Sequence, residues 1–464
     1  MIEIQVAGAG AGKTFGLSEK LINCAILNAD CHKIIYAITY TNSAKRKINA
    51  TILERIGYIP TKLRIETVHS FFLNEIIYPF SKFTTSEMYS NAVSFKLPDH
   101  IPFKKSKINI LKKRNIIHNE EVFKKAKIII DRNNSKHNNK FKKEKVDFII
   151  SHINSKIGHI FIDECQDLDS DALKAFDILG LNNINIYMIG DPKQAIKYPK
   201  DFNNFINYSK KNDAEKYLIS EPNNTTKRIP SAILKISNLF CPSNQVQVNE
   251  YDNIGSISYI TSVDDSFHNL IEHYKKLNKL IYIEKKQGNY ETHRDFKKIH
   301  FPLTLEDKLR NLPKYSHLDV DLFLSSLILE LNEKLKKATV KNILIEFQKE
   351  YVAFDKYEYA EFNETLESCK NVSNSNYVVS SIDAVKGLES DTCLFILNES
   401  MYKYLIKDIP KTSHNNKNWN KLYVALTRSS ESLILLVDKE LFPNVNLSIV
   451  ENSFAKLNIK KYIR

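Results

Sequence analysis

The sequence has few cysteines and no long apolar run. The six cysteines are Cys24, Cys31, Cys165, Cys241, Cys369 and Cys393. They are scattered without a C-x-x-C pair, which argues against a zinc ribbon, an iron–sulfur cluster and a disulfide framework. No apolar stretch approaches the roughly 20 residues that cross a membrane, and Glu3 and Gln5 interrupt the apolar start. We therefore expect a cytoplasmic protein with reduced cysteines and without a signal peptide.

Positive charge is concentrated in one part of the chain. The 464 residues carry a net charge of +13, which indicates an anionic partner. Most of the excess lies between Lys96 and Lys145, where 16 Lys and Arg stand against 5 Asp and Glu. One interpretation is a solvated, poorly ordered insertion. The other is a phosphate-contacting surface with Phe103, Phe123 and Phe141 as apolar anchors.

A glycine-rich loop follows the first apolar strand, in "MIEIQVAGAGAGKTFG". Ala7 to Thr14, "AGAGAGKT", has the spacing of a Walker A loop, with Ala7 in the first glycine position. Small residues let backbone N–H groups turn onto phosphates at a helix N-terminus. We expect Lys13 to contact the β- and γ-phosphates of a nucleotide and Thr14 to contact Mg²⁺. The helical pattern of "FGLSEKLINCAIL" directly afterwards supports this nucleotide site.

Two further apolar strands end in polar clusters. The strand Ile160 to Ile162 ends at Asp163 and Glu164, and in P-loop enzymes such carboxylates hold Mg²⁺ and polarise the attacking water. The strand "INIYMIG" ends in "DPKQAI", which places Asp191 and Gln194 at another strand terminus. Ligands bind at the carboxyl ends of strands in a parallel sheet. The pattern therefore predicts an α/β fold with a doubly wound parallel sheet and a single shared site.

The polar blocks resemble, in order, the motifs of superfamily 1 helicases of the UvrD/Rep/PcrA type. The matching blocks are "AGAGAGKT" (motif I), "TYTNSAKRKI" (Ia), "TVHSF" (Ib), "DECQD" (II), "GDPKQAI" (III), "TTKRIPSAI" (IV), "SIDAVKGLES" (V) and "LYVALTRSSESL" (VI). Together they extend over most of the chain. The resemblance implies two RecA-like P-loop motor domains, ATP and Mg²⁺ as cofactors, and single-stranded or duplex DNA as a partner.

The resemblance also implies roles for individual residues. Glu164 would be the general base, Gln194 would sense the γ-phosphate, and Arg228 and Arg428 would reach the transferring phosphoryl group from the second motor domain. The implied Mg²⁺ ligands are Thr14 and Asp163. The implied nucleotide-binding residues are Ala7, Gly8, Ala9, Gly10, Ala11, Gly12, Lys13, Thr14, Phe15, Gly387 and Glu389. The implied DNA-binding residues are Thr39, Asn42, Thr67, His69 and Ser70. For polar residues outside motifs I, II, IV and VI, ordinary loop or capping chemistry is the alternative.

Several positions depart from the family pattern. Phe15 stands where relatives often have a basic residue, and Lys227 stands where they have an aromatic one, so the usual adenine sandwich is altered. The tryptophan that stacks a base after motif III is missing, and Tyr198 is the nearest aromatic replacement. Motif V reads Asp383 and Ala384 where relatives usually have histidine and serine. The ATPase core is therefore better supported than efficient unwinding.

The order of the blocks predicts a domain organisation. The expected domains are motor domain 1A (1–80 and 150–223), a basic insertion 1B (81–149), motor domain 2A (224–294 and 371–464) and a reduced helical 2B-like insertion (295–370). The last contains helical patterns such as "LDVDLFLSSLILELNEKLKK".

Two functions agree with these motifs. The first is an ATP-dependent translocase or helicase on single-stranded DNA, with 3′ to 5′ polarity implied by the family. The second is a regulatory ATPase that senses DNA and activates a separately encoded nuclease without efficient unwinding. The compact chain and the block "SFFLNEIIYPF" are similar to the UvrD-like subunits of Gabija anti-phage systems, which implies a nuclease partner protein. The UvrD-like character of the blocks disfavours an RNA helicase.

Overall fold

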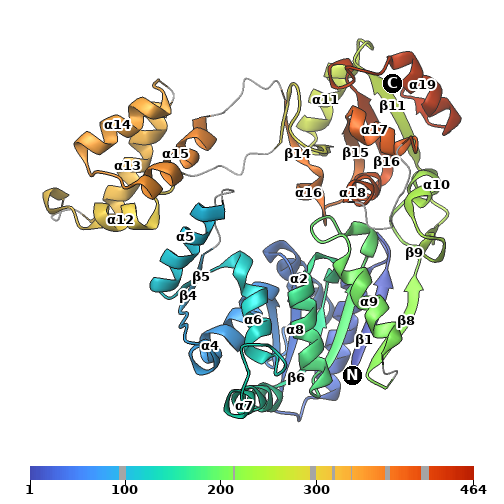
Figure 1. The fold of residues 1–464 in the computed structure, drawn as a ribbon. Coiled ribbons are helices and arrows are strands. Elements are labelled where there is room, and N and C mark those ends of the chain that lie inside the picture. The colour runs from blue at the N-terminus through green and yellow to red at the C-terminus, as the bar shows by residue number, and fades with distance from the viewer. Residues whose placement is uncertain are drawn as a thin grey trace. The chain divides into compact units, whose positions relative to one another are not determined.

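The computed structural model describes most of the chain and divides it into two compact units (Figure 1). The described residues are 1–93, 101–212, 215–292, 299–315, 319–335, 337–370, 377–408 and 417–463. The first unit comprises Met1–Phe95, Ile108–Lys285 and Ser380–Arg464, and the second comprises Lys96–Lys107 and Lys286–Val379. None of the helices in the described part of the chain has the length and apolarity that a membrane crossing requires.

The first unit begins with a six-stranded parallel sheet, in the strand order β3-β2-β6-β7-β1-β8. Its strands are β1 (Ile2–Ala7), β2 (Ile34–Thr39), β3 (Leu63–Thr67), β6 (Ile157–Ile162), β7 (Asn185–Gly190) and β8 (Tyr217–Asn223). Near-continuous apolar strands are typical of a sheet that is covered on both faces. In β2, Ile35 and Ala37 point into one core while Tyr36 and Ile38 point into the other. We call this sheet with its helices the first lobe.

Helices cover both faces of this sheet. The helices α1 (Lys13–Leu27) and α2 (Asn42–Ile56) supply Leu17, Leu21 and Ile48 to the core on one face. The opposite face is covered by α3 (Val68–Phe72), α6 (Val122–Ile130), α8 (Ser170–Leu181) and α9 (Asp201–Lys211). Because all strands are parallel, the polar residues that follow β1, β2, β6 and β7 meet at one edge of the sheet.

A second parallel sheet follows in the chain, in the strand order β13-β14-β12-β15-β16-β11-β17. Its strands are β11 (Ser256–Thr261), β12 (Leu280–Ile283), β13 (Tyr290–Thr292), β14 (Tyr377–Ser381), β15 (Ser390–Leu397), β16 (Ser429–Val437) and β17 (Lys460–Lys461). The accompanying helices are α10 (Ser231–Ser237), α11 (Phe267–Lys276), α16 (Ile382–Val385), α17 (Glu399–Leu405), α18 (Lys417–Leu426) and α19 (Leu447–Lys456). The short strands β9 (Thr225–Thr226) and β10 (Val248–Asn249) pair with each other. We call residues 224–285 and 380–463 the second lobe. The predicted α/β fold with two parallel sheets is confirmed.

The basic segment forms helices in its described part. Two elements precede the segment, α4 (Tyr78–Thr84) and β4 (Asn91–Val93). The segment itself contains α5 (Ile101–Lys113), β5 (Ile116–His118), α6 and the beginning of α7 (Lys140–Lys156). Phe123, predicted as an apolar anchor of the segment, is 4% exposed and packs against Phe72 in the first-lobe core. Lys125 is buried and ion-paired with Glu87. Residues 96–100 of the predicted segment lie outside the described part.

Apart from β13 and most of β14, the described part of the second unit is mainly helical, and it has its own core. Its main helices are α12 (Leu303–Arg310), α13 (Val320–Leu335), α14 (Val340–Glu350) and α15 (Lys356–Lys370). Leu327, Phe347 and Phe362 are buried among them. Lys308 Nζ forms an ion pair with Oε2 of the buried Glu358, at a distance of 2.7 Å. The predicted domain boundaries stay a prediction, and residues 294, 295 and 371 lie outside the described residues.

Candidate nucleotide and DNA site

A cavity of about 920 Å³ lies at the carboxyl edge of the first sheet, between the two lobes. We call it the P-loop cavity. The predicted site residues that line it are Gly10, Ala11, Gly12, Lys13, Thr14, Phe15, Asp163, Glu164, Gln194, Arg228, Gly387, Glu389 and Arg428. Ala7, Gly8 and Ala9, which were also predicted to bind the nucleotide, are buried and do not line the cavity. The structure thus gathers residues from the predicted motifs I to VI around one space.

The P-loop connects β1 to α1. Gly10 and Gly12 have φ angles of 70° and 73°, a left-handed conformation that favours glycine. No side chain caps the N-terminus of α1, so its backbone N–H groups face the cavity as potential anion donors. Lys13 Nζ donates to the backbone carbonyl of Gly8 at 3.2 Å. The loop therefore presents both a helix N-terminus and an ammonium group to a bound phosphate.

Two carboxylates from the end of β6 face the P-loop. Thr14 Oγ1 donates to Asp163 Oδ2 at 3.0 Å. Glu164 has a left-handed φ of 55°, an uncommon conformation for this residue, and accepts a hydrogen bond from the Gln166 amide. Backbone conformations that are unfavourable for a residue, such as this one, are concentrated at functional sites. Asp163 and Glu164 are thus placed to act on the same ligand.

Burial and the surrounding charges shift the pKa values of Asp163 and Glu164. Burial raises the pKa of Asp163, and the neighbouring Glu164 raises it further. Burial alone would also raise the pKa of Glu164, but Lys13 and Lys386 outweigh it and hold that pKa below its ordinary value. Glu164 is therefore ionised at neutral pH, as a general base must be.

The Thr14 hydroxyl and the Asp163 carboxylate fit a magnesium ion. Mg²⁺ prefers oxygen ligands and is commonly held by one or two protein groups together with substrate phosphates. A divalent cation would also offset the cost of the buried Asp163 charge. Within the described ranges there is no group of three or more His, Cys, Asp or Glu that could hold a metal by protein ligands alone. Thr14 and Asp163 are thus suited to a metal that is shared with a nucleotide.

Two arginines approach the cavity from the second lobe. Arg428 is 1% exposed and donates from Nη2 to Gln194 Oε1 at 3.4 Å. Burial lowers the pKa of Arg428 to about 10, and the positive charge of Arg228 adds to this effect. An anionic group between the two guanidinium groups would relieve their repulsion. Both arginines line the P-loop cavity, and Arg228 forms an ion pair there with Glu389.

Two basic residues that line the cavity, Lys47 and Lys386, were not singled out from the sequence. Lys386 forms an ion pair with Asp167, which follows the motif II carboxylates, and thereby connects the two lobes. Lys47 of α2 lines the cavity near Phe15, whose exposed ring lies 3.6 Å from the Arg55 guanidinium carbon. Lys386 directly precedes Gly387 in the motif V block, and that position was a usable signal. Lys47 lies in the motif Ia block "TYTNSAKRKI", which was a signal of the same kind.

The residues predicted to bind DNA do not all face solvent. Asn42 is exposed at the start of α2, but Thr39 is 1% exposed at the end of β2. Thr67 caps α3 by accepting from the Ser70 backbone N–H at 3.2 Å and also donates to the Ser70 hydroxyl at 2.9 Å. The structure thus gives Thr67 and Ser70 a local capping role and keeps Thr39 inside the lobe.

A surface cluster of aromatic and basic side chains adjoins these residues. Lys197 Nζ donates to Tyr40 Oη at 2.6 Å and lies 5.3 Å from the centre of the Tyr198 ring. The His69 ring lies 5.8 Å from that of Tyr40 and 4.5 Å from that of Phe123. Burial lowers the pKa of His69 to about 4, with Lys197 contributing. We call Tyr40, His69, Lys197 and Tyr198 the aromatic–lysine patch.

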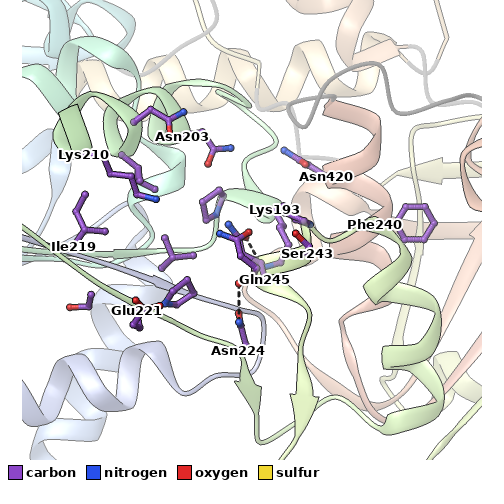
Figure 2. Close-up of a pocket in the computed structure, with 18 of the residues that line it drawn as sticks. Lys193, Asn203, Lys210, Ile219, Glu221, Asn224, Phe240, Ser243, Gln245 and Asn420 are labelled. Carbon is purple, nitrogen blue, oxygen red and sulfur yellow. Dashed lines mark hydrogen bonds between the residues drawn. The ribbon is translucent and has the colours of Figure 1, made fainter.

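A second cavity, of about 880 Å³, lies beside the motif III segment (Figure 2). Asn203 and Lys210 of α9, Glu221 of β8 and Asn420 of α18 line it. At its inner wall, Lys193 is buried and donates to Gln245 Oε1 at 3.1 Å. Lys193 thereby connects motif III to the second lobe.

Comparisons with known proteins agree with this geometry. Residues 2–199 match the family described as an AAA domain. Gabija protein GajB of Bacillus cereus (strain VD045) is 27% identical, over 99% of this chain and 96% of that protein. The chain resembles GajB from end to end. The match to GajB extends past residue 199, where the AAA match ends, into the part of the chain that holds Arg228 and Arg428. The helicase resemblance predicted from the sequence is confirmed.

Solved structures that match the chain have lower sequence identity to it than GajB has. The crystal structure of arterivirus nonstructural protein 10 (helicase) matches at 10% identity and a TM-score of 0.37. Its complex with DNA matches at 8% identity and the same TM-score of 0.37. Each match covers 97% of this chain but only 61% and 62% of the other chain. The chain thus spans about three fifths of the length of those helicase chains, and GajB remains the more informative comparison.

Proposed function

We propose that the chain is an ATP-dependent single-stranded-DNA translocase or DNA helicase that serves as the helicase subunit of an anti-phage complex. The observation that carries the proposal is the P-loop cavity, where Lys13, Glu164 and Arg428 from three separate motifs line one space. The likeness to GajB supports the assignment to defence. A partner nuclease would supply DNA cleavage.

In the proposed reaction, the P-loop N–H groups and Lys13 hold the nucleotide phosphates. Thr14 and Asp163 would hold Mg²⁺, which supplies positive charge to the phosphate oxygens when bound. Glu164 accepts the proton of the attacking water, because its carboxylate is ionised and faces the cavity. Arg428 and Gln194 stabilise the charge that develops on the γ-phosphoryl group.

The proposed function implies two motor domains. Residues 1–80 and 150–223 form motor domain 1A in this proposal, and residues 224–294 and 371–464 form motor domain 2A. Lys386 and Arg428 reach the cavity from the second lobe, while Lys13 belongs to the first. Nucleotide binding would therefore change the contact between the lobes, and hydrolysis would release it.

DNA would bind at the aromatic–lysine patch and pass across both lobes. Bases stack on aromatic rings, and lysine neutralises phosphates. We propose translocation from 3′ to 5′, on the basis of the family resemblance.

The second candidate is a DNA-sensing ATPase that activates a partner nuclease without efficient unwinding. The burial of Thr39 and the capping role of Thr67 favour it, because they leave fewer side chains for the DNA track. Asp383, in place of the family histidine, is exposed and forms an ion pair with Lys421 at 3.5 Å. Strong ATPase stimulation by DNA without strand displacement would select this candidate.

Steady-state ATP hydrolysis with and without single-stranded DNA tests the proposal, with Lys13→Ala as the control for contaminating activity. We expect stimulation of roughly tenfold or more that disappears in the variant. Partial duplexes with a 3′ or a 5′ single-stranded tail then test unwinding and polarity. Hydrolysis that does not depend on Lys13 would overturn the proposal.

A further inference from the structure

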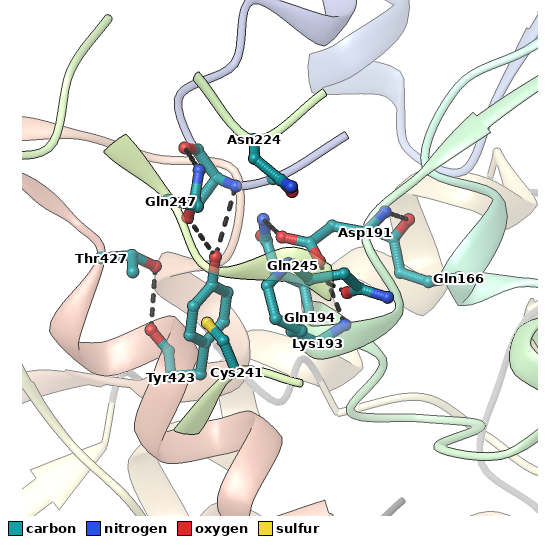
Figure 3. Close-up of polar contacts among 12 residues, drawn as sticks. Gln166, Asp191, Lys193, Gln194, Asn224, Cys241, Gln245, Gln247, Tyr423 and Thr427 are labelled. Carbon is teal, nitrogen blue, oxygen red and sulfur yellow. Dashed lines mark hydrogen bonds and ion pairs between the residues drawn. The ribbon is translucent and has the colours of Figure 1, made fainter. Parts of the chain in front are cut away.

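The beginning of the P-loop is held by two side chains of the second lobe (Figure 3). Gln247 Nε2 donates to the Ala9 carbonyl at 2.9 Å. The Ala9 N–H points at Tyr423 Oη over 3.4 Å, and Tyr423 Oη donates to Gln247 Oε1 at 2.6 Å. The three residues therefore form a closed ring of hydrogen bonds that uses both backbone polar groups of Ala9.

Water cannot readily replace this ring. The exposed fractions of Ala9, Gln247 and Tyr423 are 0%, 2% and 1%. A buried donor or acceptor that loses its partner pays its full desolvation cost. The orientation of the Gln247 amide is also determined, because the flipped amide would direct its oxygen at the Ala9 carbonyl oxygen. Burial raises the pKa of Tyr423 well above its ordinary range, so its hydroxyl remains a donor.

The second lobe fixes Gln247 independently of the P-loop. The Gln247 backbone N–H donates to Asn238 Oδ1 at 2.9 Å, and Asn238 Nδ2 donates to the Gln247 carbonyl at 2.8 Å. Tyr423 belongs to α18, and the Lys193 ammonium lies 5.3 Å from the centre of its ring. Both side chains thus approach Ala9 from the second lobe, and the Gln247 backbone is fixed there by two hydrogen bonds to Asn238.

Gly8 is a glycine because Gln247 occupies the space beside it. A Cβ atom at position 8 would lie 2.6 Å from Gln247 Cδ and closer still to Nε2. All three nearest atoms belong to Gln247. Gly8 is not among the residues with positive φ, so an alanine there would be opposed by this side chain and not by the backbone conformation.

A neighbouring contact extends the same attachment. The Lys227 backbone N–H donates to the Gly10 carbonyl at 2.9 Å. Ala9 and Gly10 are therefore hydrogen-bonded from the second lobe, while Gly12, Lys13 and Thr14 line the P-loop cavity.

We propose that Gln247 and Tyr423 are positioning residues that hold the P-loop in its binding conformation, so that nucleotide affinity depends on contact between the lobes. This inference rests on the proposed nucleotide-binding function. It assigns to Gln247 a role that none of the eight sequence blocks includes.

The first test is Gln247→Glu in the full chain, which keeps the shape but replaces the donor with an oxygen facing the Ala9 carbonyl. We expect the dissociation constant for a fluorescent ATP analogue with Mg²⁺, and the KM for ATP, to rise about tenfold. The kcat should change less than about threefold, because Glu164 and Arg428 are untouched. Asn244→Asp, a matched amide-to-acid change at an exposed position, should leave both values unchanged.

The second test uses the contact at Gly8. Gly8→Ala alone should weaken analogue binding about tenfold or more, because the methyl group displaces Gln247 or the P-loop. Gly8→Ala combined with Gln247→Ala should bind better than Gly8→Ala alone, because the obstructing side chain is gone. Circular dichroism and the thermal midpoint confirm that each variant is folded.

Failure of the proposed role of Gln247 can be distinguished from failure of the proposed ATPase activity. Normal analogue binding by the folded Gln247→Glu variant would overturn the inference, and so would a double variant whose losses simply add. If wild-type protein binds the analogue but shows no Lys13-dependent hydrolysis, the proposed ATPase fails while the binding tests still decide the role of Gln247.

Discussion

Arg228 Nη1 donates to the carboxylate of Glu389 at 2.6 Å, and its Nη2 donates to the Thr427 carbonyl at 2.9 Å. Burial acts to raise the pKa of Glu389, but the Arg228 charge outweighs it and holds that pKa below its ordinary value. The arginine expected to reach the phosphoryl group is therefore engaged by a carboxylate on the cavity wall. A phosphate must compete with Glu389 for it.

Glu389→Gln should release Arg228 and raise ATP turnover without DNA by up to about fivefold. The limit follows because the Glu389 side chain is 53% exposed, and exposed pairs contribute about 1 kcal/mol or less. Steady-state hydrolysis measures the effect, and a fall in turnover would show that the carboxylate itself is required.

Glu164→Gln should reduce kcat by about 10² to 10⁴ while nucleotide binding persists, because the amide fills the same space but cannot accept the proton of water. Lys13→Ala should lose binding as well. Equilibrium binding of a fluorescent ATP analogue, measured beside single-turnover hydrolysis, separates the two variants. A Glu164→Gln variant with near-normal turnover would assign the base to another group.

Stability should fall as the pH drops from about 6.5 to about 4, in part because of His69. The unfolded chain carries this histidine with an ordinary pKa of about 6.5, whereas burial lowers it to about 4 in the folded protein. The unfolded state therefore binds more protons between these values, and protonation favours unfolding. The expected loss is at most about 2 kcal/mol, since the side chain is only partly buried.

Urea unfolding at several pH values measures this slope, and His69→Gln should flatten it. His32→Gln, at an exposed position, should not. An unchanged slope in His69→Gln would assign the pH dependence to other groups.

Tyr198→Ala should weaken single-stranded-DNA binding about tenfold, since stacking contributes roughly 1 to 3 kcal/mol per base. Lys197→Ala should lower the slope of log affinity against log salt by about 0.7 if it contacts one phosphate. Fluorescence anisotropy over a salt series measures both. Tyr251→Ala, at a ring that is 63% exposed in the second lobe, is the matched control. Unchanged affinity in Tyr198→Ala would remove the aromatic–lysine patch from the DNA path.

The basic segment requires point substitutions rather than deletion, because Phe123 and its neighbours belong to the first-lobe core. Changing exposed Lys113 and Lys124 together to glutamine should lower the salt slope by about 1.4 if both contact phosphates. The matched pair, Lys276 and Lys456, lies on α11 and α19 and should have no effect. An unchanged slope in the first pair would leave the segment as a solvated face.

Contiguous blocks made the P-loop cavity predictable. Lys13 and Thr14 follow β1 directly, and Asp163 and Glu164 follow β6, so strand order alone brings them to one edge of a parallel sheet. Hydrophobic patterning predicted strands of the first sheet, which are covered on two faces. The second sheet was implied by the helicase resemblance.

Burial at single positions was not predictable in the same way. Thr39 ends a strand at the expected place, but its side chain points into the lobe. Phe123 sits in a lysine-rich segment whose charge suggested a surface, whereas the apolar face of α6 buries it. Gln247 acts through side-chain contacts across more than 200 residues of chain, and no local pattern marks such a contact.

The place of β1 in the sheet has a consequence for how the protein is made. β1 is bordered by β7 and β8, and its residue Ile2 pairs with Ile186 and Tyr217. During synthesis at about 5 to 20 residues per second, the strand that carries the P-loop waits roughly 10 to 40 seconds for its first neighbour. Through that interval an apolar strand with open edges is available to other chains. The sheet of the first lobe can thus be completed only after β7 and β8 have been synthesised.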